Sequence, residues 1–252
     1  MPRFTLFAAI ALALEFGAAD AGAQLLRNTS SEEQVVVDAA QVLDELMTIP
    51  LRSIPSSLLA TSEGVIICPK VLKVGFVLGG RGGRGVLLMK TGERDWSNPI
   101  LLRLHGGSVG WQAGVQSSDV MLVLRTRRTV NALLEGQRFT LGADASIAAG
   151  PLGRETAAST DLKLQSEILS YSRSRGLFAG ISFNGSALNI DAAANGAYYQ
   201  RAGVTPADII AGKNLAPPQS AQVLREAVAR HASAEMPAEV AGKPNETDSK
   251  GR

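Results

Sequence analysis

Residues 71–85 read Val-Leu-Lys-Val-Gly-Phe-Val-Leu-Gly-Gly-Arg-Gly-Gly-Arg-Gly, and this stretch decides the fold. Its first half is apolar and strand-like and carries Lys73, whereas its second half is rich in glycine and contains two arginines. Three interpretations are open: a nucleotide-binding loop, a β-hairpin turn, or a basic edge that faces lipid. Because the following residues, 86–89, again read as a strand, we expect a turn between two strands. The turn-forming residues would be Gly80, Gly82, Gly83 and Gly85.

The strand-like sequence pattern continues from residue 64 to residue 191. Short apolar or alternating runs recur there, separated by Gly-Gly, Ser-Asp, Asn-Gly and Gly-Pro pairs. Many short strands with few intervening helices are typical of an antiparallel, sandwich- or barrel-like sheet. The predicted strands are 65–68, 74–78, 86–89, 100–104, 109–115, 120–124, 138–143, 168–172 and 178–183.

Helices are predicted on both sides of this sheet. Ser30 or Ser31 can cap a helix that extends to Leu46, and its apolar residues recur at helical spacing. The other predicted helices are 55–60, a helical turn at 129–134, 192–200, 206–211 and 219–231. With 252 residues, 45% of them hydrophobic, the chain can bury a real core. We therefore predict a single α+β domain over residues 24–232.

The two ends of the chain are predicted to lie outside the folded domain. Arg3, the apolar run at 4–14 and Ala21-Gly22-Ala23 match the three parts of a cleavable signal peptide, predicted at residues 1–23. The protein is then expected to be exported and to lie in the periplasm or on the envelope, peripheral to a membrane. Residues 233–252 are polar and contain proline, which predicts a disordered tail.

Charge and motif context argue against nucleic acid and nucleotides as ligands. The formal net charge of +2 is too small for a nucleic-acid-binding protein without a concentrated basic face. Gly80-x-Gly82-x-x-Gly85 matches the dinucleotide fingerprint in letters only. That fingerprint requires a helix after the last glycine, and a strand is predicted there instead.

A second motif, at 106–110, has the G-x-S-x-G spacing of a hydrolase nucleophile elbow, with Ser108 as the nucleophile. The elbow needs a helix after the serine, but residues 109–115 read as a strand. The only histidines are His105, almost adjacent to the serine, and His231, at the edge of the tail. We therefore expect no enzyme, and a serine hydrolase that uses Ser108 remains the least favoured alternative.

The potential metal ligands are few. The two histidines and the one cysteine are not at ligand spacing, so we expect neither a metal site nor a cofactor. Cys68 lies in an apolar strand and is expected to be buried as a small hydrophobic residue.

Basic residues gather in three places next to Gly- or Ser-rich segments. The groups are Lys70, Lys73, Arg81 and Arg84; Arg125, Arg127 and Arg128; and Arg173 and Arg175. Such clusters can bind anionic head groups, at up to about 1 kcal/mol per charge near a membrane surface. They can equally form a solvated face that protects sheet edges. The basic residues alone leave both interpretations open.

Several longer motifs, in order along the chain, resemble the SYLF domain family. The resemblance covers about residues 31–230 and is highly specific. The motifs are Val74-Gly75-Phe76, Arg81 to Val86, Trp96-Ser97-x-Pro99, Gly114-Val115-x-x-Ser118-Asp119, Leu141 to Asp144, Gly150 to Arg154, Tyr171 to Gly180, and Tyr198-Tyr199.

The resemblance implies a binding function without catalysis. Eukaryotic members of the family bind phosphoinositides through an N-terminal amphipathic helix and basic residues, and the yeast branch also binds actin. Carried over by motif, the candidate lipid-binding residues are Lys73, Arg81, Arg84, Arg173 and Arg175. One departure is that residues 32–46 contain five acidic residues and no Lys or Arg, so anionic lipid would repel this helix.

The predicted function is therefore non-enzymatic binding of anionic phospholipid or phosphoinositide head groups at a membrane surface, through a basic, glycine-rich edge. Because export is predicted, phosphatidylglycerol or cardiolipin would be the natural ligands, and actin is not expected as a partner in a bacterial envelope. The main alternative is a structural scaffold whose partner is an envelope protein.

Overall fold

The computed structural model describes residues 30–49, 53–75, 78–109, 114–136, 138–150, 166–174, 177–178 and 183–233. Residues 1–23 and 234–252 lie outside these ranges, so the signal peptide and the tail remain predictions. Arg175 also lies outside the described residues.

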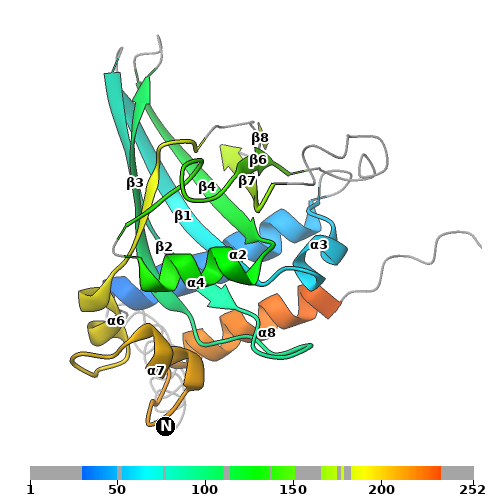
Figure 1. Ribbon diagram of the computed structural model, residues 1–252, viewed down its shortest axis with the longest axis vertical. Coiled ribbons are helices and arrows are strands. Elements are labelled where there is room, and N and C mark those ends of the chain that lie inside the picture. The colour runs from blue at the N-terminus through cyan, green and yellow to red at the C-terminus, as the bar shows by residue number, and fades with distance from the viewer. Residues whose placement is uncertain are drawn as a thin grey trace, which may run out of the picture.

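The described chain forms one α+β unit in which a strongly curled sheet is flanked by N- and C-terminal helices (Figure 1). This architecture confirms the predicted fold class. The helices are α2 (Ser31–Thr48), α3 (Ser56–Ala60), α4 (Arg127–Glu135), α6 (Ala192–Tyr198), α7 (Pro206–Ala211) and α8 (Gln219–Ser233). The strands are β1 (Gly64–Gly75), β2 (Leu78–Met89), β3 (Ile100–Val109), β4 (Gly114–Leu124), β5 (Phe139–Thr140), β6 (Ile147–Ala149), β7 (Ile168–Ser174), β8 (Leu177–Phe178) and β9 (Ala187–Ile190).

Among the described residues the strand order is β5-β9-β3-β2-β1-β4-β7-β6, with β8 paired to β7. All pairs are antiparallel except β6 with β7. The four long strands β1 to β4 form the centre of the curl, which is a half-barrel (Figure 1). Helix α4 contacts both β4 and β9, which flank the three central strands, so it lies across the hollow of the curl.

The sheet therefore has two faces with different coverings. We call the side that contacts α2 and α6 the outer face, and the side that contacts α4 the inner face. Since side chains alternate along a strand and register partners share a face, the register assigns residues to each side. Arg84 pairs with Arg103, and both belong to the outer face, whereas Lys73 pairs with Arg81 on the inner face.

The prediction for the glycine-rich stretch was wrong. Gly80, Gly82, Gly83 and Gly85 do not form a turn but lie inside β2, paired with β1 and β3. The described glycines with positive φ are elsewhere, at Gly142, Gly185, Gly203 and Gly212. A strand needs only extended backbone, so the reason for glycine in β2 is not conformational freedom.

Close approach between strands explains two of these glycines. In β1, Ile67 faces Val86 and Leu72 faces Gly82, so residues 68–71 oppose the shorter segment 83–85 and form a β-bulge. A Cβ on Gly85 would lie 2.7 Å from the Ile67 carbonyl oxygen, and one on Gly83 would lie 2.9 Å from Val71 Cγ2. The bulge therefore fills the space that side chains at these two positions would need.

The bulge also places a basic residue on the protein surface. Lys70 adopts a left-handed φ of 51°, which is uncommon for a residue other than glycine. Its backbone N–H donates to Asp119 Oδ1 at 3.1 Å, and this bond satisfies the amide that the bulge removes from the strand ladder.

Other strand predictions differ from the structure in extent. The predicted strand 74–78 spans the end of β1 and the start of β2, and 109–115 spans the end of β3 and the start of β4, with 110–113 outside the described residues. Strands β6 and β9 were not predicted, because they are short and have no clear alternation. The helices were predicted more closely, since α7 has the predicted bounds and α2 begins directly after its Ser30 cap.

Two of the family motifs meet where α6 joins the sheet. The Asn195 side chain accepts from the Leu101 amide and donates to the Leu101 carbonyl oxygen, both at 2.9 Å. Tyr199 donates to the Pro99 carbonyl oxygen at 2.6 Å. Asn195 and the motif residue Tyr199 therefore attach α6 to the start of β3, and α6 forms one wall of the site described next.

Candidate functional site

Helix α2 connects the sheet to α8 through its acidic side chains. Glu32 pairs with Arg84 of β2 at 2.8 Å, and Asp38 pairs with Lys70 of the bulge at 2.7 Å. Further along the helix, Glu45 pairs with Arg173 of β7, and Asp44 pairs with Arg230 and His231 of α8. Four of the five acidic side chains of α2 are thus paired with basic residues of the same protein.

Arg173 is largely buried and forms ion pairs within the protein. Its guanidinium lies between Glu45 and Asp119, and its side chain is only 15% exposed. Although burial alone would lower its pKa, hydrogen bonds and attraction from the two carboxylates raise it. The hydrogen bond from Arg173 in turn lowers the pKa of Glu45. Arg173 therefore stays charged and holds α2 against the sheet.

Arg173→Gln should destabilise the fold by about 2–3 kcal/mol, because two carboxylates lose a charged hydrogen-bond donor. Arg230→Gln is the matched control: its side chain is 64% exposed and it pairs with the half-exposed Asp44, so its loss should cost less than about 0.5 kcal/mol. Urea unfolding of both variants provides the comparison. Equal midpoints for Arg173→Gln and the parent would contradict a structural role for Arg173.

The structure divides the other predicted lipid-binding residues between the two faces. Arg84 lies on the outer face, where its Nη1 is 3.2 Å from Ser31 Oγ in addition to its pair with Glu32. Lys73 and Arg81 lie on the inner face, and the Arg81 guanidinium carbon is 5.2 Å from the centre of the Phe183 ring, a cation–π contact. The predicted residues therefore do not share one edge, and their role in lipid binding stays a prediction.

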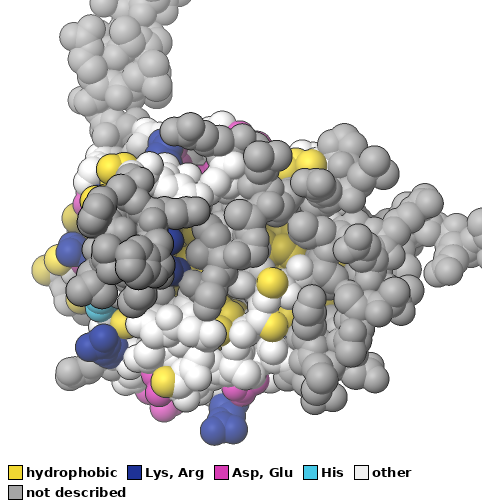
Figure 2. All heavy atoms as spheres, turned by 90° about the horizontal axis from the view of Figure 1, so that it is seen from above, with side chains coloured by type: hydrophobic (Ala, Val, Ile, Leu, Met, Phe, Trp, Pro, Cys, Tyr) yellow, Lys and Arg dark blue, Asp and Glu magenta, His cyan; other side chains and the backbone are white. Residues whose placement is uncertain are grey.

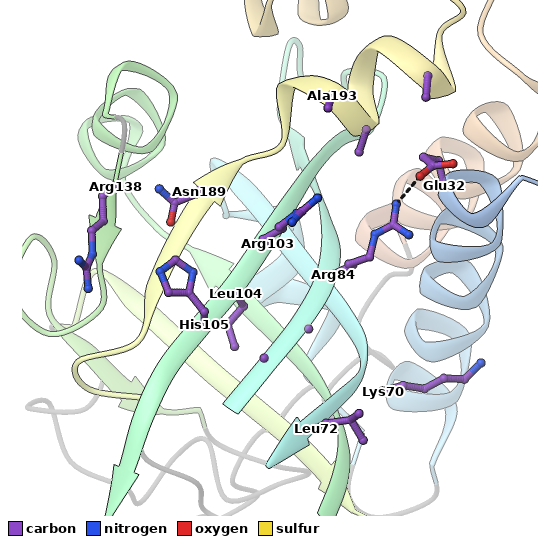
Figure 3. Close-up of a pocket in the computed structure, with 14 residues that line it drawn as sticks. Glu32, Lys70, Leu72, Arg84, Arg103, Leu104, His105, Arg138, Asn189 and Ala193 are labelled. Atoms are coloured by element: carbon purple, nitrogen blue, oxygen red, sulfur yellow. Dashed lines mark hydrogen bonds and ion pairs between the residues drawn. The ribbon is translucent and has the colours of Figure 1, made fainter. Parts of the chain in front are cut away.

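A groove of about 1120 Å³ opens on the outer face between α2 and α6 (Figure 3). Strands β1, β2 and β3 form its floor, together with Asn189 of β9. Its lining contains a single carboxylate, Glu32, which is paired with Arg84. The lining cations are Lys70, Arg84, Arg103 and Arg138, and His105 lies among them.

The order of the strands brings these residues together. Arg84, Arg103 and Asn189 are register partners across β2, β3 and β9, and His105 lies two residues further along β3, opposite Gly82. Arg138, just before β5, lies at the far side of the groove from Arg84 (Figure 3). The result is a row of basic side chains across the outer face.

Arg103 is an accessible charged group of this row. Its Nε is 2.5 Å from Asp191 Oδ2, yet its side chain is 64% exposed. Since a guanidinium has five N–H donors, it can bind a ligand while this ion pair persists. Burial would raise the Asp191 pKa, but bonds from the Ala194 amide and Arg103 lower it, so this carboxylate stays ionised and orients Arg103.

Sequence reasoning missed Arg103, His105, Arg138 and Asn189. One available signal was the two-residue spacing of Arg103, on the predicted strand 100–104, and His105, just beyond it, which places both on one face when the strand continues. Asn189 and Arg138 reach the groove because β9 pairs with β3 and β5 pairs with β9. No local sequence pattern indicates these pairings.

The context of Ser108 differs from that of a nucleophile elbow. Ser108 lies within β3, paired in register with Gly79, and the next described element is strand β4 rather than a helix. His231 is 2.6 Å from Asp44 and lies on α8. Cys68 is buried as expected, and burial raises its pKa to about 12.

Comparison with known proteins identifies relatives. The family described as "Ysc84: Las17-binding protein actin regulator" matches residues 105–231. The chain is 32% identical over 190 residues to the SH3 domain-containing YSC84-like protein 1 of Xenopus laevis, covering 73% of this chain and 56% of that protein. It is 35% identical over 155 residues to the Homo sapiens protein of that name, covering 60% and 45% respectively.

A yeast relative is similar over a comparable length. Protein YSC84 of Saccharomyces cerevisiae is 36% identical over 174 residues, covering 68% of this chain and 37% of the yeast protein. The chain thus spans about half the length, or less, of these relatives.

Proposed function

Because the chain belongs to the Ysc84/SYLF domain family, we propose that it is a binding module without catalytic activity, and that it binds anionic phospholipid head groups at a membrane surface. The observation that carries the proposal is the charge of the outer-face groove. Four cations line it against one carboxylate, Glu32. Lys70, Arg84 and Arg103 each have one carboxylate partner, but Lys70 and Arg103 stay largely exposed and keep further N–H donors for a ligand.

The chemistry of the groove suits a phosphate group. A guanidinium can donate two parallel N–H bonds to phosphate oxygens, and charged hydrogen bonds of this kind are about twice as strong as neutral ones. Arg84 and Arg103 are register partners on adjacent strands, so a phosphate between them could accept from both. Lys70 and Arg138 add charge at the margins of the groove.

The acidic helix does not oppose such binding in the way its sequence alone implied. Its carboxylates at Glu32, Asp38 and Glu45 form ion pairs with Arg84, Lys70 and Arg173, which offset most of their charge. Within this proposal α2 is a wall of the groove, and the head group approaches over the sheet rather than over the helix.

The proposed location is the periplasm or envelope of a bacterium, which follows from the expected signal peptide. Phosphatidylglycerol or cardiolipin would then be the ligand rather than a phosphoinositide. In the described part of the chain, no helix has the length and apolar character to span a bilayer. The proposed contact with the membrane is peripheral.

Salt dependence tests this proposal. The protein should co-sediment with phosphatidylglycerol or cardiolipin vesicles at 0.1 M salt and not with phosphatidylcholine vesicles. Binding should be lost toward 1 M salt, because the Debye length falls from about 10 Å to about 3 Å. Absence of binding to anionic vesicles at low salt, or binding that ignores salt, would contradict a Coulombic head-group site.

A protein partner is the second candidate. The names of the relatives favour it, since the family is described as Las17-binding and a further yeast relative is named "LAS seventeen-binding protein 3". For an exported chain the partner would be an envelope protein. This function takes first place if the vesicle experiment fails.

A further inference from the structure

The outer face continues beyond the basic groove toward the ends of the strands, and its character changes there. Leu72, Val74 and Val115 are among the exposed large hydrophobic side chains of the described residues, 49%, 52% and 67% exposed. Val74 and Val115 are direct register partners on β1 and β4, and Leu72 also lines the groove. An apolar surface is thus continuous with the charged one.

Glycine extends this apolar surface across the next two strands. Gly80 of β2 pairs with Val74, and Gly107 of β3 pairs with Gly80, so the four residues form one row. A Cβ at Gly80 or at Gly107 would meet nothing within 4 Å, in contrast to Gly83 and Gly85. Packing within the protein does not require glycine at these two positions. Glycine inside a strand marks a bulge, a tight bend, or a place where a ligand or another backbone comes close. Gly80 and Gly107 lie in regular register, without a bulge.

We infer that this row and Leu72, which we call the glycine–valine platform, enter the interfacial layer of an anionic bilayer while the groove binds its phosphates. The inference rests on the proposed function and deepens it, because it gives the protein an orientation on the membrane. The view from this end of the molecule shows hydrophobic side chains at the surface, with Lys and Arg side chains at its margins (Figure 2).

The spacing of the rows fits the thickness of the interface. Strands rise about 3.3 Å per residue, so the row of Gly82 and His105 lies about 7 Å from the platform row, and the row of Arg84 and Arg103 about 13 Å. The polar layer on each side of a bilayer is about 5–8 Å thick. With Val74 at the acyl boundary, His105 lies among the head groups, and the long arginine side chains reach the phosphates from just outside.

Charge and apolar area then act together. The groove attracts the anionic surface, and the platform adds apolar burial that salt does not screen. A neutral bilayer offers the apolar layer without a net negative charge. The platform alone should therefore not be enough for binding to neutral vesicles.

The test variant is Val74→Ser with Val115→Ser, because both side chains are largely exposed and their loss leaves the core intact. Binding to phosphatidylglycerol vesicles should weaken about 10- to 100-fold, given the burial of two valines. Binding of dihexanoyl phosphatidylglycerol, kept below its micelle concentration, should not change. Val37→Ser with Val223→Ser, two exposed valines on α2 and α8, is the matched control and should bind vesicles as the parent does.

A fluorescent reporter gives a second readout. Cys68 is buried, so a single Val115→Cys variant can be labelled selectively with an environment-sensitive dye. Its emission should rise and shift to the blue on anionic vesicles, while a dye at Val37→Cys should not respond.

The inference is overturned if the platform variant binds vesicles as tightly as the parent, or if the dye at position 115 stays in water. It is also overturned if the two serines only convert an oligomer to a monomer, because a second copy of the chain would then be the occupant. A parent protein that binds neither vesicles nor the soluble lipid would instead refute the proposed function itself.

Discussion

Gly85→Ala should destabilise the protein by about 3 kcal/mol, the upper range for forcing a methyl group into a packed site. The added Cβ would lie 2.7 Å from the Ile67 carbonyl oxygen and 3.1 Å from Cys68 Cα, where the β1 bulge begins. Backbone atoms cannot rotate away as a side chain can, so β1 or β2 must move. The bulge that sets the position of Lys70 would move with them.

Gly80→Ala is the control for this prediction, five residues earlier in the same strand. Its Cβ would meet nothing within 4 Å, so stability should change by no more than about 1 kcal/mol, with a gain expected from the stiffer unfolded chain. Chemical denaturation of the two variants measures the difference. If both variants are as stable as the parent, the close approach of the bulge to β2 is not what requires glycine.

Neutralising the exposed cations of the groove should weaken binding to anionic vesicles roughly 100-fold. The variant carries Lys70→Gln, Arg103→Gln and Arg138→Gln, and each charge near an anionic surface is worth about 1 kcal/mol. Arg84 is left in place because its pair with Glu32 holds α2 to β2. The dissociation constant for phosphatidylglycerol vesicles at 0.1 M salt is the quantity to measure.

A control with the same loss of charge separates the groove from net charge. Arg128, Lys213 and Arg230 are exposed and do not line the groove, and their change to Gln should reduce binding less than about threefold. Circular dichroism melting should show that both triple variants remain folded. Equal weakening in the two triple variants would mean that overall charge, not the groove, determines vesicle binding.

Elements with a local, periodic signal could be predicted from the sequence. The apolar stripe through Val36, Leu43 and Leu46 is buried in the structure as expected for α2. The apolar run 86–89 is a strand, and the many short strands do form one antiparallel, curled sheet. Such signals arise within one turn of helix or a few residues of strand, so they are readable in a single sequence.

The glycine-rich stretch could not be interpreted correctly because its meaning depends on distant residues. Gly83 and Gly85 are required by the bulge at 68–71, and no sequence pattern near these glycines predicts that bulge. Glycine is far commoner in turns than within strands, which made a turn the natural prediction.

The basic residues show the same limit. Arg173 matched a distinctive family motif, yet it lies between Glu45 and Asp119, two carboxylates brought to it by α2 and β4. Arg103 and Arg138 belong to no basic cluster in the sequence but meet in one groove, since β9 and β5 extend the sheet beside β3. Ion pairing and strand order, both long-range, decide which charges remain accessible.

Mapping the ligand on the backbone tests the central claim most directly. Proton–nitrogen spectra of the folded protein can be titrated with dihexanoyl phosphatidylglycerol below its micelle concentration at low salt. The largest shifts should fall on amides of the outer-face groove, at Gly82, Arg84, Arg103, His105 and Asn189, and should revert at 1 M salt. Shifts that instead cluster on the inner face, around Lys73, Arg81 and Ser118, or no shifts at all, would contradict the account.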